Sequence, residues 1–110
     1  MRRSGRNLRH VLVVGTGNLA RLLIDKIRHH DDFGLVVEGL VAADAARVGD
    51  TAYGVPVVGS VADLPRVAEE RGIEIIYLAL AREEWQAEEQ ALAALADSTA
   101  AVRLVPDLTR

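Results

Sequence analysis

The chain has 110 residues, enough for one hydrophobic core but too few for a full six-stranded dinucleotide fold with a substrate domain. Half of the residues are apolar and 4% are aromatic, and the absence of cysteine excludes a disulfide framework, a thiol nucleophile and a thiolate metal site. The formal net charge of −3 gives no sign of a nucleic-acid surface, so we expect no nucleic-acid partner.

The first nine residues are basic and lack an apolar segment. Arginines at positions 2, 3, 6 and 9 alternate with small and polar residues. Two interpretations stay open: a solvated flexible tail, or a juxtamembrane junction that follows a membrane helix and faces anionic lipid. No apolar run reaches the roughly 18 residues that span a bilayer, and no signal peptide is visible. We therefore expect a cytoplasmic location.

A strand, a glycine turn and a helix follow in direct succession. Residues 11–14 are all apolar, which is typical of a strand buried on both faces of a parallel sheet. Gly15, Thr16 and Gly17 interrupt this run, and from Asn18 the apolar residues recur at helical spacing. With Ala20, the two glycines match G-x-G-x-x-G/A. The pattern predicts a loop whose helix start receives an anion such as a pyrophosphate.

The next segments predict a turn, a second strand and an acidic residue at its end. His29 and His30 are adjacent and diverge on a helix, so we expect no metal site, and residues 31–34 indicate a turn. Residues 35–42 read as a strand in which Gly39 allows a bulge or a close approach. The first acid after this strand is Asp44, which either binds a ribose or caps a short helical turn over 45–48.

The second half of the chain predicts two further helices and three further strands. Pro56 confines the strand at 55–58 to a sheet edge, or leaves only its last two residues paired. A helix begins at Ser60 with a shortened capping box and ends at Gly72. The apolar run over 73–81 belongs beside the first strand, and 101–105 forms the last strand.

The helix expected over residues 82–97 lies between those two strands. We expect one of its faces to be lined by Trp85, Leu92, Leu95 and Ala96, and the row of Ala87, Ala91 and Ala94 to let a neighbouring element come near. Glu83 and Glu84 favour the positive end of this helix, and neither has a visible partner for acid–base catalysis.

Together these elements predict an α/β fold. We expect a Rossmann-like three-layer sandwich over residues 10–110, with a mainly parallel five-stranded sheet in the order 3-2-1-4-5. Such a sheet leaves a free edge at the Pro56 strand or at the last strand, where a second copy of the chain would pair as a homo-oligomer.

Several stretches, in this order, resemble a known family module. They are VLVVGTGNLARLL (11–23), VVEGLVAADAARVG (36–49), GVPVVGSVADLP (54–65), IEIIYLALA (73–81) and VRLVPDL (102–108). The chain resembles the Rossmann-like "CoA-binding-type" cytoplasmic domain of bacterial polyprenyl-phosphate glycosyl-1-phosphate transferases, which begin exopolysaccharide repeat units. The resemblance implies membrane helices before the module and a catalytic transferase domain after it, both as partners in the same parent chain. A related module precedes membrane-bound nucleotide-sugar dehydratases, so that parent stays open.

The resemblance also implies a ligand site. Its cofactor-binding positions would be Gly15, Thr16, Gly17, Asn18, Leu19, Asp44, Leu80 and Ala81. Two departures from the family pattern stand out: Ala42 and Ala43 replace the usual acids after the second strand, and Ala81 replaces the usual proline after the fourth. The first departure weakens the case for NAD.

Three functions follow from this pattern. The leading one is a non-catalytic regulatory module for a small anionic ligand, either a nucleotide, a nucleotide sugar, coenzyme A or NAD(P). The second is a structural or oligomerisation module whose loop is empty. The third is an NAD(P)-binding fragment of a dehydratase or oxidoreductase. We expect no catalytic residue and no metal site in this chain, because it has no nucleophile–base pair and its single lysine, Lys26, forms no Tyr-x-x-x-Lys pair.

Overall fold

The computed structural model describes residues 8–30 and 34–106. The first seven residues of the expected basic tail and most of the expected turn over 31–34 lie outside the described residues.

One mostly parallel sheet carries the fold, as the sequence predicts, but it has one strand more than expected. The sheet order is β3-β4-β2-β1-β5-β6. Five strands run parallel: β1 (Arg9–Val14), β2 (Leu35–Ala42), β4 (Val55–Ser60), β5 (Ile75–Leu78) and β6 (Ala101–Leu104). They have the predicted order. The additional strand, β3 (Thr51–Ala52), pairs antiparallel with β4 and lies at the edge.

Pro56 therefore does not mark the edge of the sheet. It pairs with Thr51 of β3, and the parallel pairing of β4 with β2 begins at Val57 and continues to Ser60. A proline has no N–H to donate, and none is needed toward β3, because the neighbouring Val57 N–H donates to the Asp50 carbonyl at 2.8 Å. The edge predicted at Pro56 is wrong because the turn residues before it form a strand of their own.

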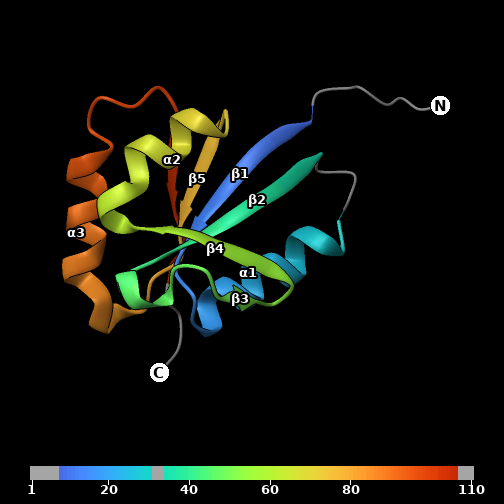
Figure 1. Cartoon of the computed structure of the whole chain (residues 1–110). Coiled ribbons are helices and arrows are strands. Elements are labelled where there is room, and N and C mark those ends of the chain that lie inside the picture. Colours follow the sequence, from blue (N-terminus) through green and yellow to red (C-terminus); the bar gives the residue numbers. More distant parts are fainter. Residues whose placement is uncertain (1–7, 31–33, 107–110) are drawn as a thin grey trace.

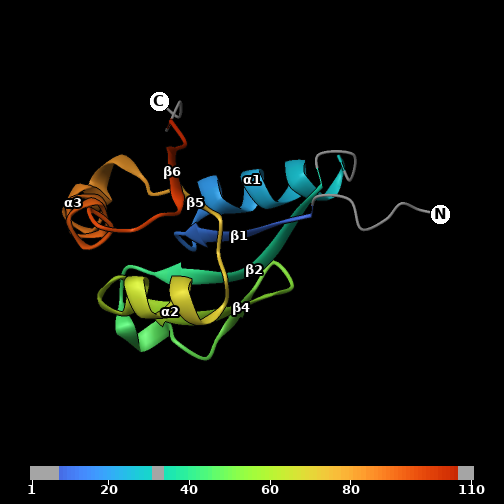
Figure 2. The ribbon, with the colours of Figure 1, turned by 90° about the horizontal axis from the view of Figure 1, so that it is seen from above.

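The helices cover the two faces of the sheet, which makes three layers. The helix α1 (Asn18–Arg28) packs on one face, and α2 (Leu64–Glu70) and α3 (Trp85–Ala94) pack on the other (Figures 1 and 2). The last four residues of β1 have no exposed surface, because β1 lies in the centre with a helix layer on each side. Alternate residues of β1 enter opposite cores, Val11 and Val13 toward α1, and Leu12 and Val14 toward α2 and α3.

The structure confirms the alanine row of α3 but only part of the predicted apolar face. Ala91 is buried and Ala87 packs against the core, as expected of a row that lets a neighbour come near. On the predicted apolar face, Leu95 is buried, whereas Trp85 is 55% exposed and Leu92 is 43% exposed. The two largest side chains of that face therefore point toward solvent.

Bulges in β2 and β4 meet at Gly39. The β1–β2 register skips Glu38, and the β2–β4 register skips Val58. A Cβ atom on Gly39 would lie 2.9 Å from Cγ1 of Val58. The sequence predicts a bulge or a close approach at Gly39, and the structure shows both.

Short 3-10 turns follow three of the strands at the carboxyl edge of the sheet. η2 (Ala45–Arg47) lies between β2 and β3, whereas η3 (Val61–Asp63) leads into α2 and η4 (Arg82–Glu84) leads into α3. The predicted cap at Ser60 is present, since Asp63 Oδ2 accepts hydrogen bonds from the Ser60 N–H at 3.1 Å and from its Oγ at 3.3 Å. These turns place loops around the end of β1, where the glycine turn lies.

Candidate functional site

The glycine loop, which we define as Gly15, Thr16 and Gly17, lies between the carboxyl end of β1 and the start of α1. In doubly wound sheets, ligands bind at the carboxyl edge of the strands, in the crevice beside the first strand. The strands β2 and β5 flank β1 on either side, so their ends border this loop.

Gly15 is required by the packing of the protein itself. Its φ angle is +131°, and a Cβ atom there would lie 2.3 Å from the carbonyl oxygen of Ala79. Its N–H donates to the Val41 carbonyl at 2.8 Å, and the Ala79 N–H donates to the Val14 carbonyl at 2.9 Å. Gly15 is thus held between the ends of β2 and β5, where only glycine fits.

Gly17 is not required by packing. It is the N-cap of α1, with φ −94° and ψ −160°, a conformation that any residue adopts. Apart from its two chain neighbours, none of the described residues has an atom within 4 Å of the position that its Cβ would take. The space beside Gly17 is therefore open, and it faces the start of a helix whose first turn holds no acidic residue. The free N–H groups and the positive dipole end of α1 favour an anion there.

Asn18 and Arg21 add polar groups to the same helix start. Asn18 Oδ1 accepts hydrogen bonds from Arg21 Nη2 at 2.6 Å and Nε at 3.2 Å, and Arg21 Nη1 lies 3.4 Å from Asp25 Oδ2. The guanidinium is thereby held over the first turn. Leu19 packs against the α1-side core, so its backbone N–H is the group available to a ligand.

Tyr53, which no sequence pattern marks as a site residue, forms hydrogen bonds to the glycine loop. Its Oη donates to the Thr16 carbonyl at 2.8 Å and lies 3.2 Å from the Gly17 carbonyl. Tyr53 and Gly54 form the two-residue turn between β3 and β4. The available signal was a Tyr-Gly pair between two short apolar stretches, which is weaker than the usual Asn-Gly of such turns.

The other predicted site residues already have roles in the fold. Asp44 Oδ1 accepts from the Ala46 N–H at 3.0 Å, so this carboxylate caps η2, one of the two alternatives that the sequence leaves open. Leu80 is buried in the core on the α2 and α3 side, and its Cδ2 lies 3.6 Å from the Cβ position of Gly15. The Ala81 N–H donates to Glu84 Oε1 at 3.0 Å. Leu80 therefore lies against the loop, while a carboxylate occupies the N–H of Ala81.

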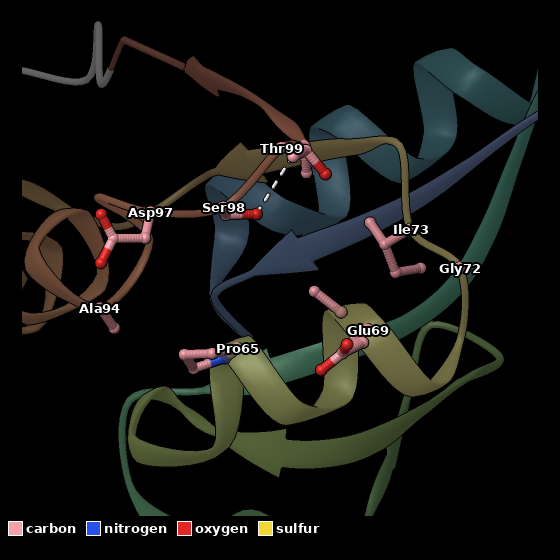
Figure 3. Close-up of a pocket in the computed structure, with 10 residues that line it drawn as sticks. Pro65, Glu69, Gly72, Ile73, Ala94, Asp97, Ser98 and Thr99 are labelled. Carbon is pink, nitrogen blue, oxygen red and sulfur yellow. Dashed lines mark hydrogen bonds between the residues drawn. The ribbon is translucent and has the colours of Figure 1, made fainter.

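A cavity of about 470 Å³ lies elsewhere, between α2 and α3 (Figure 3). Glu69 and Asp97 line it, with Ser98 and Thr99 on the loop before β6, and none of its lining residues is cationic. An anionic ligand is disfavoured by two carboxylates without a cation. The cavity is thus a poor match to a phosphate group.

The described residues form neither a metal-type cluster of side chains nor a membrane-spanning helix. Across residues 8–30 and 34–106, no three His, Asp or Glu side chains gather in a way that could hold a metal ion. None of the helices in this described part is long and apolar enough to cross a bilayer.

Solved structures share this fold at low sequence identity. UDP-D-quinovosamine 4-dehydrogenase from Vibrio fischeri superimposes with a TM-score of 0.71 over 93% of this chain and 81% of its own, at 18% identity. The Rex-family repressor RSP superimposes with a TM-score of 0.65 over 88% of this chain and 52% of its own, at 14% identity. The chain thus spans about half the length of RSP. At these identities, the likeness shows the fold.

The expectation that nucleic acid is excluded as a partner is wrong. RSP has also been solved in complex with beta-NAD+ and operator DNA, and that structure superimposes with a TM-score of 0.63 at 14% identity, over 88% of this chain and 50% of its own. The fold thus occurs in a protein that binds DNA. Net charge is a sum over one domain, and it carries no information about local patches or about further parts of a longer protein.

Sequence comparison assigns the family. No curated protein matches the sequence. A family model described as a CoA-binding domain matches residues 1–106, which is nearly the whole chain and includes the glycine loop, Tyr53 and the end of β5. The chain belongs to this family of Rossmann-like CoA-binding domains.

Proposed function

We propose that this chain is a non-catalytic binding module that holds the phosphate group of a nucleotide-type ligand at the start of α1. The observation that carries the proposal is the open space at Gly17. The protein's own packing explains the glycine at position 15, but it leaves the one at position 17 unexplained. A ligand that approaches the backbone closely would explain it, as in dinucleotide-binding loops.

The charge around the loop supports an anion. The first turn of α1 lacks an acidic residue, and Arg21 lies over it through its hydrogen bonds to Asn18. Five positions supply this part of the site: Gly15, Thr16, Gly17, Asn18 and Leu19. Asp44, Leu80 and Ala81 would border the rest of the ligand, with Asp44 less suited to a ribose because it caps η2.

Four ligand classes share the required chemistry: coenzyme A, nucleotides, nucleotide sugars and NAD(P). The family match favours coenzyme A, and the fold shared with a UDP-sugar dehydrogenase keeps nucleotide sugars in the set. We propose as parent a polyprenyl-phosphate glycosyl-1-phosphate transferase of exopolysaccharide biosynthesis, with the module at the cytoplasmic face of the inner membrane. Ligand capture would bias the orientation of the attached domains if the ligand binds one arrangement better.

A thermal-shift panel tests the binding proposal. Coenzyme A, NAD+, ATP and UDP-glucose are each added at millimolar concentration to the purified chain. A ligand at 100 times its dissociation constant stabilises the folded state by about 2.7 kcal/mol, which raises the melting temperature by several degrees. We expect one class to do so. No shift with any of the four would contradict binding and favour a structural module with an empty loop.

Gly17→Ser makes the test specific to the loop. Serine is a better N-cap than glycine, so folding stability should stay the same or rise by a few tenths of a kcal/mol, roughly. Its side chain fills the open space, and its Oγ competes for the helix N–H groups. The thermal shift should therefore disappear while the protein stays folded. An undiminished shift in this variant would place the ligand elsewhere on the molecule.

A further inference from the structure

Tyr53 contacts the glycine loop, and the anion site described above leaves this contact unexplained. We propose that Tyr53 is a positioning residue for the bound phosphate, which aims the backbone N–H of Gly17 at it. This inference rests on the proposed function and extends it by one residue and one mechanism. The phenol does not touch the ligand in this arrangement; it acts through the loop.

The direction of the Gly17 N–H follows from peptide geometry. Tyr53 Oη donates to the Thr16 carbonyl at 2.8 Å and lies within 3.2 Å of the Gly17 carbonyl. In a planar trans peptide, the carbonyl and the N–H of one unit point in opposite directions. Holding the Thr16 carbonyl on the hairpin side therefore turns the Gly17 N–H to the opposite side, away from the hairpin. The Gly17 carbonyl also accepts the Arg21 N–H at 3.1 Å, so α1 itself sets the direction of the Asn18 N–H.

Tyr53, which supplies this hydroxyl, has an unusual backbone conformation. Tyr53 has φ +56° and is the one non-glycine residue with a positive φ among those described. With Gly54 at φ +77° it forms a turn in which both residues are left-handed, a position where Asn, Asp or Gly is usual. The side chain of Tyr53 packs against the α1-side core, but that packing needs no hydroxyl. Strained residues of this kind cluster at binding sites.

The hairpin is fixed at a second point on the same helix. Arg28 Nη2 lies 3.0 Å from the position that a Cβ of Gly54 would take, so the last turn of α1 contacts the hairpin tip. Tyr53 meets the loop before the first turn. The hairpin thus spans α1 and holds the loop relative to the helix that supplies the remaining N–H groups. Such preorganisation raises affinity because less order is lost on binding.

The test is Tyr53→Phe in the full chain, with Tyr77→Phe as control. Tyr77 is a partly buried residue of β5 that packs in the same α1-side core. Dissociation constants are measured by calorimetry for coenzyme A, NAD+, ATP and UDP-glucose. For any probe that binds the unmodified chain, Tyr53→Phe should weaken affinity about tenfold, as expected for one lost hydrogen bond, and Tyr77→Phe should leave it unchanged.

A second variant and a spectrum separate positioning from folding. Tyr53→Asn suits the left-handed turn but lacks a hydroxyl that reaches the loop, so it should bind as weakly as Tyr53→Phe. Amide NMR should show the Gly17 resonance displaced in Tyr53→Phe before ligand is added. A lower melting temperature with unchanged affinity would mean that Tyr53 only packs, and would overturn the inference alone. Absence of binding by all four probes in the unmodified chain would overturn the inference together with the proposed function.

Discussion

The backbone of Gly15 lies so close to Ala79 that no side chain fits between them: a Cβ atom on Gly15 would lie 2.3 Å from the Ala79 carbonyl oxygen. Gly15→Ala should therefore unfold at lower urea concentration, with a loss of about 2–4 kcal/mol from backbone strain and displacement of β5. Gly17→Ser should lose none. Equal losses in the two variants would mean that both glycines are structural.

The contact between Gly39 and Val58 predicts a coupled pair of substitutions. Gly39→Ala should cost about 1–3 kcal/mol, because its Cβ would meet both methyl groups of Val58 at 2.9 and 3.0 Å, and a β-branched side chain cannot easily turn aside. In the double variant with Val58→Ala, part of that loss should be recovered. Chemical denaturation of the four proteins gives the coupling energy, and strict additivity would contradict the contact.

The cap formed by Asp63 at Ser60 should make folding stability depend on pH in the acid range. The pKa of its carboxyl lies below the ordinary 3.8 because the Ser60 backbone N–H donates to it, and the Arg66 guanidinium helps against the opposing effect of burial. A lowered folded-state pKa stabilises the protein above 3.8, and this contribution is lost as the pH falls through the folded value.

The urea midpoint should then fall between about pH 6 and pH 3 more steeply in the unmodified chain than in Asp63→Asn. At the higher pH the variant should be the less stable of the two. Parallel pH profiles would show that Asp63 contributes equally in both states of the chain.

Truncating side chains on the two faces of α3 should reduce folding stability by unequal amounts. Trp85→Ala should change stability by less than about 1 kcal/mol, because the indole is 55% exposed. Leu95→Ala should cost about 2–4 kcal/mol, since that side chain is 5% exposed in the core. Fluorescence from Trp85, the single tryptophan, should be readily quenched by iodide in the folded protein. A protected indole would place α3 in the other rotation.

The fold could largely be predicted from the sequence, because its signals are local. The apolar run of β1, the glycine loop and the change to helical spacing at Asn18 lie within one short stretch. The order of the five parallel strands follows once each strand is recognised. Strand β3 could not be predicted, since two residues carry no periodicity. The alanine row of α3 predicted the close packing at Ala91, but the exposure of Trp85 and Leu92 could not be predicted, because it depends on which elements pack beside the helix.

The sequence predicts the residues of the glycine loop but not the distant residues that contact it. The loop residues are adjacent in the chain, and a known spacing marks them. Tyr53 lies far from them in sequence and meets them only after β3 and β4 form a hairpin beside α1. The sequence left two alternatives for Asp44, a ribose ligand or a cap, and the structure shows the cap. The difference between Gly15 and Gly17 depends on Ala79, which no local pattern connects to the loop.

The short strand β3 also limits how copies of this chain would join. It pairs with Val55 and Pro56 of β4, and Gly49 and Asp50 bond to Val57, so among the described residues only the last three of β4 lack a neighbour on that side. The four residues of β6 at the other end are the longer unpaired edge. If two copies paired edge to edge through β6, the longer unpaired edge of each copy would be covered. A further copy would find only the short edge at β3 and β4, so the assembly is expected to stop at a dimer.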